Sequence, residues 1–288
     1  MNFLFYYILL LSLLININSC GQAQISPFEK KKLTKLDSFD FKRFIDTIGK
    51  CSLFSIKRQN YLDSLLKIKP YEPNIWQQKA MPLFKQRKYE LGMPYLDSAV
   101  KYDDKTHHFL EYRAFIKCIF QKSYKDAIKD FDLAIKLNGN HIIMDHSYEF
   151  YKGLCYLQLN NLDSAEYFID KTVKDEMKGR SFEYTHYLHW FYLGIIKYER
   201  EDYYNANIYF DNCLKLYSQL PDALYYKAYC KKSKIGEAEF IKQLEIALSF
   251  ANKGYSINED NALYEPYPYQ ISKYQLDATI QYYKSNKD

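Results

Sequence analysis

The sequence predicts an all-α fold, a solenoid of about five helix-turn-helix repeats with capping helices at the N- and C-terminal ends. Two observations lead to this prediction. A pattern of small and large apolar residues recurs at intervals of 35, 38, 41 and 34 residues. The 288-residue chain is also 48% hydrophobic and 26% charged, with nine glycines, which is enough apolar material for a sizeable core.

The clearest single unit contains Trp190, Leu193, Gly194, Ala206 and Phe210, spaced as W-x2-L-G and then A-x3-F. This spacing is typical of a helical hairpin about 34 residues long. One such hairpin cannot bury its apolar face alone, so it predicts neighbours that stack on it.

Those neighbours are found by aligning the residue that opens each second helix. These anchor residues are Gly92, Ala127, Ala165, Ala206 and Phe240. Four positions later stand the large residues Leu96, Phe131, Ile169, Phe210 and Leu244, and seven positions later Ala99, Ala134, Thr172, Cys213 and Ala247. The aromatic and close-contact positions of the first helices include Trp76, Ala80, Gly153, Trp190, Gly194 and Ala228. Such offsets place each set on one helical stripe, as a packed second helix requires.

The stretch from Tyr124 to Asn138 resembles the second half of a tetratricopeptide repeat, and the resemblance extends roughly from Pro73 to Gly254. It implies a right-handed superhelical solenoid with repeats at about 73–106, 107–141, 146–179, 187–220 and 221–254. Two departures are expected. Ala114 stands one residue too early relative to Ala127, which implies a longer turn, and an extra segment joins the third and fourth repeats near 174–185.

The N-terminus resembles a bacterial lipoprotein signal. Residues 1–28 carry no charged side chain, and the apolar run from Phe3 to Ile17 is shorter than the ~20 residues that span a bilayer. The motif around Cys20 resembles a lipobox, which implies a signal peptide over 1–19 and acylation of Cys20. An uncleaved anchor and ordinary secretion remain the alternatives.

The segments between the signal and the ends of the chain are assigned in turn. Residues 20–55 are expected to form a tether and a basic segment, because 29–60 holds nine Lys or Arg against four Asp or Glu. Within 28–52, an extra amphipathic helix is indicated by the roughly helical spacing of Leu33, Leu36, Phe44, Ile45 and Ile48. Residues 56–72 predict an N-terminal capping helix that stops at Pro70. Residues 255–288 predict a linker with turn residues and then a capping helix from about Tyr269 to Lys284.

The chain lacks the motifs of the common catalytic and nucleotide sites. It contains no G-x-G-x-x-G, P-loop, H-E-x-x-H, G-x-S-x-G or C-x-x-C. The sequence therefore predicts no enzyme, no catalytic residue and no cofactor. Residues 61–288 have 31 residues of each charge sign, so no nucleic-acid partner is expected.

Two histidine pairs are the remaining candidates for a metal. His141 and His146 flank Asp145, and His186 and His189 span one helical turn before Trp190. Each pair lacks a third ligand with clear spacing, and a closed metal site needs more ligands than two. We therefore expect no metal site, with these histidines solvated near helix starts.

The aromatic residues are the better functional lead, because 31 tyrosines exceed what helix packing needs. The resemblance implies that first-helix positions line a concave groove. The aromatic residues there are Tyr112, Phe150, Tyr151, Phe191, Tyr192, Tyr225, Tyr226 and Tyr229. The alternative is that one of the two aromatic residues in each pair packs against the next repeat instead of lining the groove. As groove residues they are expected to bury less area on folding than on binding a partner.

The sequence thus favours a non-enzymatic scaffold of the bacterial cell envelope, held at the outer membrane by a lipid on Cys20. Its expected partner is a protein or peptide segment in the groove. The alternative is a surface lipoprotein that holds glycan chains on the aromatic residues, similar to helical-repeat binders of starch-uptake systems. The partner's identity and the oligomeric state are left open by the sequence.

Overall fold

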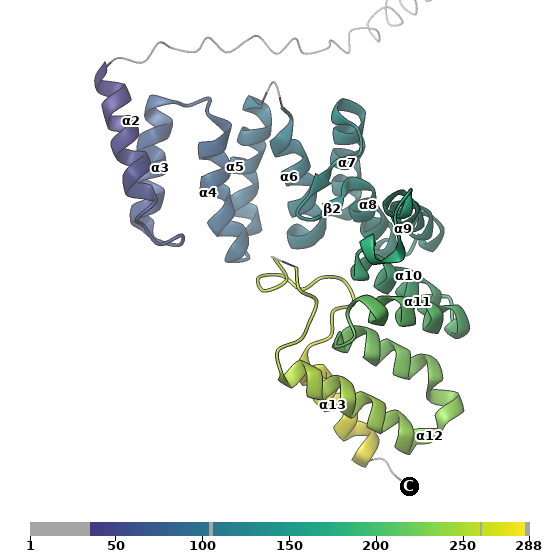
Figure 1. Ribbon diagram of the computed structural model, residues 1–288. Helices are drawn as coiled ribbons and strands as arrows, with labels where there is room; N and C mark the ends of the chain where they lie inside the picture. The colour runs from purple at the N-terminus through teal and green to yellow at the C-terminus, as the bar shows by residue number, and fades with distance from the viewer. Residues whose placement is uncertain (1–34, 104–105, 260, 286–288) are drawn as a thin grey trace, which may run out of the picture.

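The structure, a computed structural model, describes residues 35–103, 106–259 and 261–285 (Figure 1). The predicted all-α solenoid is confirmed: helices follow one another in sequence order and stack side by side along a curved array. Within the described residues the strands are confined to a two-stranded hairpin, β1 (Ile142–Ile143) and β2 (His146–Ser147).

The N-terminal end is a helical pair that caps the array. Helix α2 (Lys35–Ile48) packs on α3 (Ile56–Ile68), whose N-terminus is capped by the Ser55 hydroxyl accepting from the backbone N–H of Arg58. Leu62 and Leu65 form a small separate core with Ile75 of the first repeat. The predicted signal peptide, Cys20 and most of the tether lie outside the described residues. No helix within the described ranges is both long and apolar enough to span a bilayer.

Five hairpins follow. Their helices are α4 (Pro73–Lys85) with α5 (Tyr89–Tyr102), α6 (His108–Ile116) with α7 (Tyr124–Asn138), α8 (Tyr148–Gln158) with α9 (Leu162–Met177), α10 (Tyr187–Glu199) with α11 (Tyr203–Leu216), and the two halves of α12 (Pro221–Asn252). The two halves of α12 are separated at Gly236, whose backbone has φ +72° and ψ 163°. A side chain is rarely tolerated at this φ, so glycine allows the break.

Close helix approach within a hairpin rests on glycine. A Cβ placed on Gly194 of α10 would lie 2.5 Å from Cε1 of Phe210 in α11, and one on Gly153 of α8 would lie 2.5 Å from Cγ1 of Ile169 in α9. Two carbon atoms that are not bonded to each other cannot approach this closely. The small residue of one helix therefore makes room for the large apolar residue of its partner.

The second hairpin absorbs its extra residue in an unexpected way. The prediction of a longer turn after α6 is wrong, because the surplus is taken up inside the helix by a π-helical turn, η1 (Lys117–Gln121). A single π turn widens the helix locally and keeps both flanking segments in register. The extra segment predicted between the third and fourth hairpins includes a short 3-10 helix, η2 (Phe182–Tyr184).

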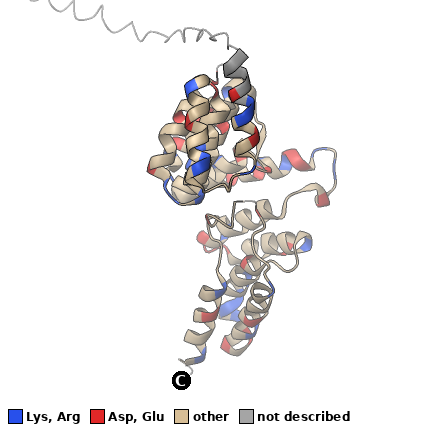
Figure 2. Cartoon of the chain, turned by 90° about the vertical axis from the view of Figure 1, so that its left-hand side faces the viewer, with Lys and Arg blue, Asp and Glu red and all other residues tan. Residues whose placement is uncertain are grey.

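The chain ends with an irregular segment and a last helix. After α12, the described residues 255–259 and 261–272 carry little regular structure and then lead into α13 (Lys273–Ser285), which packs on α12 with Ile280 in a shared core. Figure 1 shows the irregular part leaving the C-terminal end and extending back toward the N-terminal hairpins. In Figure 2 basic and acidic residues alternate along the helices, and neither sign covers a whole face of that view.

Candidate functional site

The aromatic residues of the predicted groove are mostly buried in the structure. They lie on the first helices of successive hairpins, as the periodicity requires. Those with little or no exposure are Tyr112, Phe150, Tyr151, Phe191, Tyr192 and Tyr226, whereas Tyr225 and Tyr229 are half-buried. The expectation that such side chains bury more area on binding than on folding is therefore wrong for the first six.

The cover comes from the chain itself. We call the described residues 255–259 and 261–272 the return segment; they run from α12 toward the N-terminal hairpins and back to α13 (Figure 1). Ile257 and Tyr267 of this segment are buried in the same core cluster as the inner helices. The segment predicted to be a linker is thus part of the packed structure.

Tyrosine hydroxyls of the inner surface donate to the backbone of the return segment. Tyr217 bonds the carbonyl of Ser256 at 3.2 Å. Tyr192 donates to the carbonyl oxygen of Pro268 at 3.0 Å, and Tyr226 does so to that of Tyr269 at 3.2 Å. Burial raises the pKa of both Tyr192 and Tyr226 well above the usual value, so each keeps the proton that it donates.

Two further groups recognise backbone N–H groups of the segment. The Asp222 carboxylate Oδ1 accepts from Ile271 N at 2.6 Å, and the Tyr187 hydroxyl accepts from Asn258 N at 3.0 Å. Burial raises the pKa of Asp222 to about 7, and its other oxygen has no hydrogen-bond partner. Side chains of the inner surface therefore bond both the carbonyl oxygens and the N–H groups of a main chain that is not helical.

The tip of the return segment is fixed at the first two hairpins by charge. Glu265 accepts from the Tyr89 hydroxyl at 2.8 Å and lies 2.8 Å from Lys122 Nζ and 3.4 Å from Arg87 Nε. The Tyr264 ring lies under Lys85 Nζ, 4.4 Å from the ring centroid. The Glu265 side chain is 9% exposed, whereas Arg87 and Lys122 are 66% and 47% exposed, so the contacts are shielded from solvent at their carboxylate end.

The inner rings also pack against one another rather than forming a free row. Phe191 lies 6.0 Å from the rings of both Phe210 and Tyr226, and Phe150 lies 5.8 Å from Tyr192, measured between centroids. Phe191 therefore contacts the second helix of its own hairpin and the next first helix. Its role in the structure is to join hairpins.

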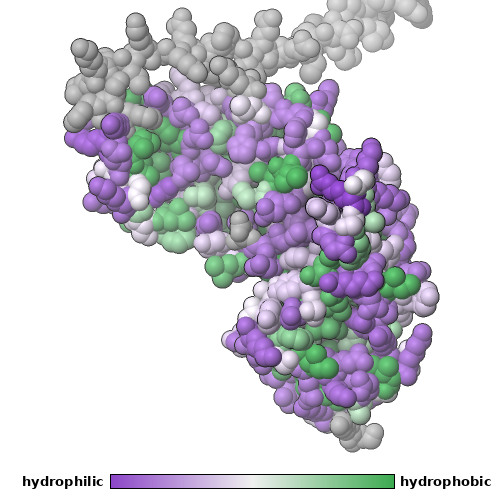
Figure 3. Space-filling view, viewed as in Figure 1, coloured by the Kyte–Doolittle hydropathy of each residue, from purple (hydrophilic) through white to green (hydrophobic). Residues whose placement is uncertain are grey.

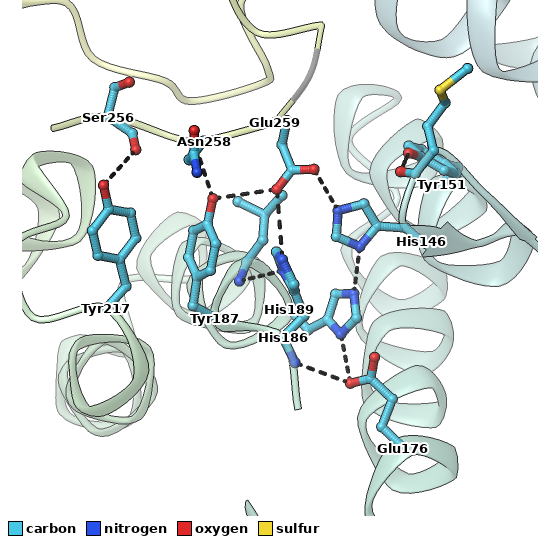
Figure 4. Close-up of polar contacts among 12 residues, drawn as sticks. His146, Tyr151, Glu176, His186, Tyr187, His189, Tyr217, Ser256, Asn258 and Glu259 are labelled. Atoms are coloured by element: carbon cyan, nitrogen blue, oxygen red, sulfur yellow. Dashed lines mark hydrogen bonds and ion pairs between the residues drawn. The ribbon is translucent and has the colours of Figure 1, made fainter. Parts of the chain in front are cut away.

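A second polar cluster lies where the third and fourth hairpins meet the return segment (Figure 4). The β1–β2 turn, with Met144 and Asp145 both at positive φ, brings His146 back into the core. His186 is the N-cap residue of α10, and His189 follows in the first turn of that helix.

These histidines are joined to each other and to two glutamates. His146 Nδ1 lies 3.0 Å from His189 Nε2, and His146 Nε2 lies 3.1 Å from Glu259 Oε2. His189 Nδ1 lies 2.9 Å from Glu176 Oε2, and His186 Nε2 lies 3.8 Å from Glu259 Oε1. We call these five side chains the histidine cluster.

Burial controls the charge of the cluster. It lowers the pKa of His186 to about 3 and that of His189 well below the usual value, with the neighbouring His146 acting in the same direction. Burial also raises the pKa of Glu176 to about 7. The imidazoles of His186 and His189 are therefore neutral at pH 7 and keep a lone pair on one ring nitrogen.

The expectation that neither histidine pair has a third ligand is wrong. The structure separates the predicted pair of His141 and His146, leaving His141 exposed, and brings His146 to His186 and His189. One nitrogen from each of these three rings lies within 4.8 Å of the others. Sequence spacing missed the group because its members come from a turn and a helix start 40 residues apart.

The return segment was the other feature that sequence reasoning missed. It has no helical period, and its partners lie 76 residues away for Pro268 and 113 for Glu259. One signal was available in the sequence. The segment is rich in tyrosine, with Tyr255, Tyr264, Tyr267 and Tyr269, which is unusual for a solvated linker.

The stacked hairpins and their close small–large contacts define a tetratricopeptide-repeat solenoid. No protein-family model matches the chain, and no curated protein does so either. Among solved structures, a tetratricopeptide repeat protein from Parabacteroides merdae is similar, with a TM-score of 0.60, 17% identity, and 88% of this chain and 89% of that chain covered.

Two other solved structures share the fold. PilW, a widely conserved type IV pilus biogenesis factor, matches with a TM-score of 0.53 and 11% identity over 76% of this chain and 92% of its own. PilF of Pseudomonas aeruginosa matches with a TM-score of 0.51 and 14% identity over 75% of this chain and 89% of its own. At these identities the likeness is one of fold.

Proposed function

We propose that this protein is a non-enzymatic protein-interaction scaffold that binds an extended peptide along its inner surface, in exchange with its own return segment. The partner peptide takes over the hydrogen bonds that the segment makes. The chain is held at the bacterial envelope, at the outer membrane, through a lipid on Cys20.

The observation that carries this proposal is the recognition of main chain by the inner surface. Tyr192 and Tyr226 donate to consecutive backbone carbonyls, those of Pro268 and Tyr269, and Asp222 accepts the N–H of Ile271. Contacts to backbone depend little on sequence, so a foreign extended segment can use them as well. The same inner surface therefore suits any peptide that adopts this conformation.

In the view of Figure 3, polar residues cover much of the molecule, and apolar residues occur in separate groups. On that face, no continuous apolar patch stands out as a docking site for a large partner.

One of the similar proteins has a role in assembly. PilW, whose solenoid resembles this one, is a pilus biogenesis factor. We propose an assembly role of that general sort for this chain. A glycan is less suited to the inner surface, because Phe150 and Phe191 are fully buried and pack against rings of the solenoid itself, and so offer no open ring face for a sugar.

If an incoming peptide replaces the return segment, a mutation that weakens the attachment of the segment should raise the affinity for the peptide. Glu265→Ala removes the tip anchor and should leave the contacts of an incoming peptide unchanged. If a charge-assisted bond of ~1.5–3 kcal/mol is lost, the free groove is populated more often, and peptide affinity rises by about tenfold or more. Peptides selected from a random phage library on the full chain provide the probe, and the dissociation constant is measured by fluorescence anisotropy.

The exposed Glu237→Ala is the matched control and should leave the affinity unchanged. Peptides that bind must also compete with a synthetic peptide of residues 255–272. A peptide that binds Glu265→Ala and the parent chain equally, or binding of a glycan array with no peptide selected, would contradict the proposal.

A further inference from the structure

The histidine cluster has the composition of a metal-binding site. Imidazole nitrogens from His146, His186 and His189 converge within 4.8 Å of one another. His146 and His189 are each 1% exposed. His186 is the accessible member, because its side chain is 32% exposed. Three converging imidazoles resemble the three-ligand sites in which zinc keeps its fourth position free.

Three short contacts join the cluster in a row, from Glu259 to His146, from His146 to His189, and from His189 to Glu176. Each ring nitrogen that faces a carboxylate can donate its N–H to that carboxylate. The two nitrogens that remain, His146 Nδ1 and His189 Nε2, then present lone pairs to each other across 3.0 Å. A cation between them would be bound by both lone pairs.

A divalent cation at this position fits both the charge and the orientation of the rings. Its positive charge would offset the carboxylates of Glu176 and Glu259, of which Glu259 is 3% exposed and costly to bury as an unpaired ion. Each carboxylate already bonds the ring nitrogen that faces away from the other histidine. This carboxylate–histidine arrangement is the one that orients and strengthens metal-ligating imidazoles.

We propose that His146, His186 and His189 bind one divalent transition-metal ion, of which Zn²⁺ suits the ligand set best, through His146 Nδ1 and Nε2 of the other two rings. Neutral imidazoles favour Zn²⁺ over Mg²⁺ or Ca²⁺, which prefer oxygen ligands. Water or Glu259 Oε1, which lies 3.8 Å from His186 Nε2, completes the coordination.

The rearrangement needed is one of side chains. With Zn–N bonds of about 2.0–2.1 Å in a tetrahedron, ligand nitrogens lie about 3.3–3.4 Å apart. The contact between His146 and His189, now 3.0 Å, opens by a few tenths of an ångström, and the partly exposed His186 ring moves in from within 4.8 Å. When His186 binds the ion through Nε2, the proton of the neutral ring lies on Nδ1. Nδ1 can then no longer accept from Leu188 N, which lies 3.3 Å away. That distance is at the long end for a hydrogen bond, so its loss costs little.

The metal site also bears on the return segment. Glu259 belongs to this segment, and it accepts from His146 on one side and lies near His186 on the other. A bound ion would strengthen both interactions and hold the segment in place. The site itself does not depend on peptide binding, so it can be tested separately.

The test is a Zn²⁺ titration by calorimetry of the full chain, produced without a polyhistidine tag and stripped with EDTA. We expect one saturable site per chain with a micromolar or lower dissociation constant, and a tetrahedral Co²⁺ absorption spectrum. His186→Ala should weaken binding at least about tenfold, and Glu259→Gln should do so by ~10- to 100-fold, as for other outer carboxylates. The exposed His141→Ala is the control and should bind as the parent does.

His186→Ala is chosen because the residue is partly exposed, and circular dichroism of the metal-free variant checks that it folds. As an independent readout, Zn²⁺ should raise the melting temperature of the parent and of His141→Ala, but less that of His186→Ala. The proposal is overturned by the absence of saturable binding, by an octahedral Co²⁺ spectrum, or by equal affinity of the parent and His186→Ala.

Discussion

Tyrosines on the inner and outer surfaces of this solenoid have opposite environments. Tyr192 on α10 is fully buried beneath the return segment, whereas Tyr167 on α9 and Tyr204 on α11 are 61% and 73% exposed. The difference arises from residues 255–272, which contact the first helices of the hairpins. Aromatic residues of the inner surface are therefore partners of the return segment, a peptide that belongs to the same chain.

The largest effect is expected inside a hairpin, where neither surface is involved. Gly194→Leu places a side chain where a Cβ alone would be 2.5 Å from Phe210. The overpacking cost, at or above the upper end of ~1–3 kcal/mol, exceeds the ~1 kcal/mol that leucine gains over glycine in a helix. Chemical denaturation measures the loss of unfolding free energy.

A matched control and a rescue sharpen this prediction. Gly49→Leu, at a turn where the nearest atom is 3.8 Å away, should change stability little. Adding Phe210→Leu to Gly194→Leu should restore part of the loss, because the ring carbon that causes the clash is gone. Equal effects at the two glycines would contradict the packing described for the hairpin.

A stability effect of a few kcal/mol is expected from Asp222, which joins the inner surface to the segment. Burial raises its pKa to about 7, so the folded protein holds this proton more tightly than the unfolded chain, whose carboxyl ionises near pH 4. Unfolding therefore releases a proton between about pH 4 and 7, and the contribution of Asp222 to stability falls as the pH rises through this range.

Asp222→Asn keeps an oxygen that accepts from Ile271 and removes the titration. Its unfolding free energy should exceed that of the parent above pH 7, on the order of a few kcal/mol, and the gain should shrink toward pH 4. Denaturation across pH measures this difference, with the exposed Asp277→Asn as the control. Parallel pH profiles for Asp222→Asn and the parent would show that Asp222 is not buried as described.

The local part of this architecture followed from the sequence, and the long-range part did not. Gly194, Ala206 and Phe210 belong to one hairpin, so their spacing alone predicts which helices pack. Pro268 contacts Tyr192 from 76 residues away, and no period in the sequence relates these two residues. The histidine cluster has the same cause, since His146 meets Glu259 only because the segment returns. Patterns with a helical period predict neighbours along the array, not an irregular peptide laid across it.

A smaller effect tests the comparison between the two surfaces directly. Tyr192→Phe removes the hydroxyl that bonds Pro268 and keeps the ring, so it should lower the unfolding free energy by ~0.5–1.5 kcal/mol. Tyr204→Phe on the outer surface should lower it by less than about 0.5 kcal/mol. Thermal and chemical denaturation of the two variants provide the measurement. Equal changes would remove the distinction between the surfaces.

In the isolated protein the return segment occupies the inner surface of the solenoid. Hydrogen exchange of the full chain, followed by mass spectrometry over residues 255–272, measures this occupancy. The bonded amides of Asn258 and Ile271 should exchange at least ~100-fold more slowly than in an unstructured peptide, and faster in Glu265→Ala. Exchange of the segment at the unstructured rate, while α10 stays protected, would contradict the account.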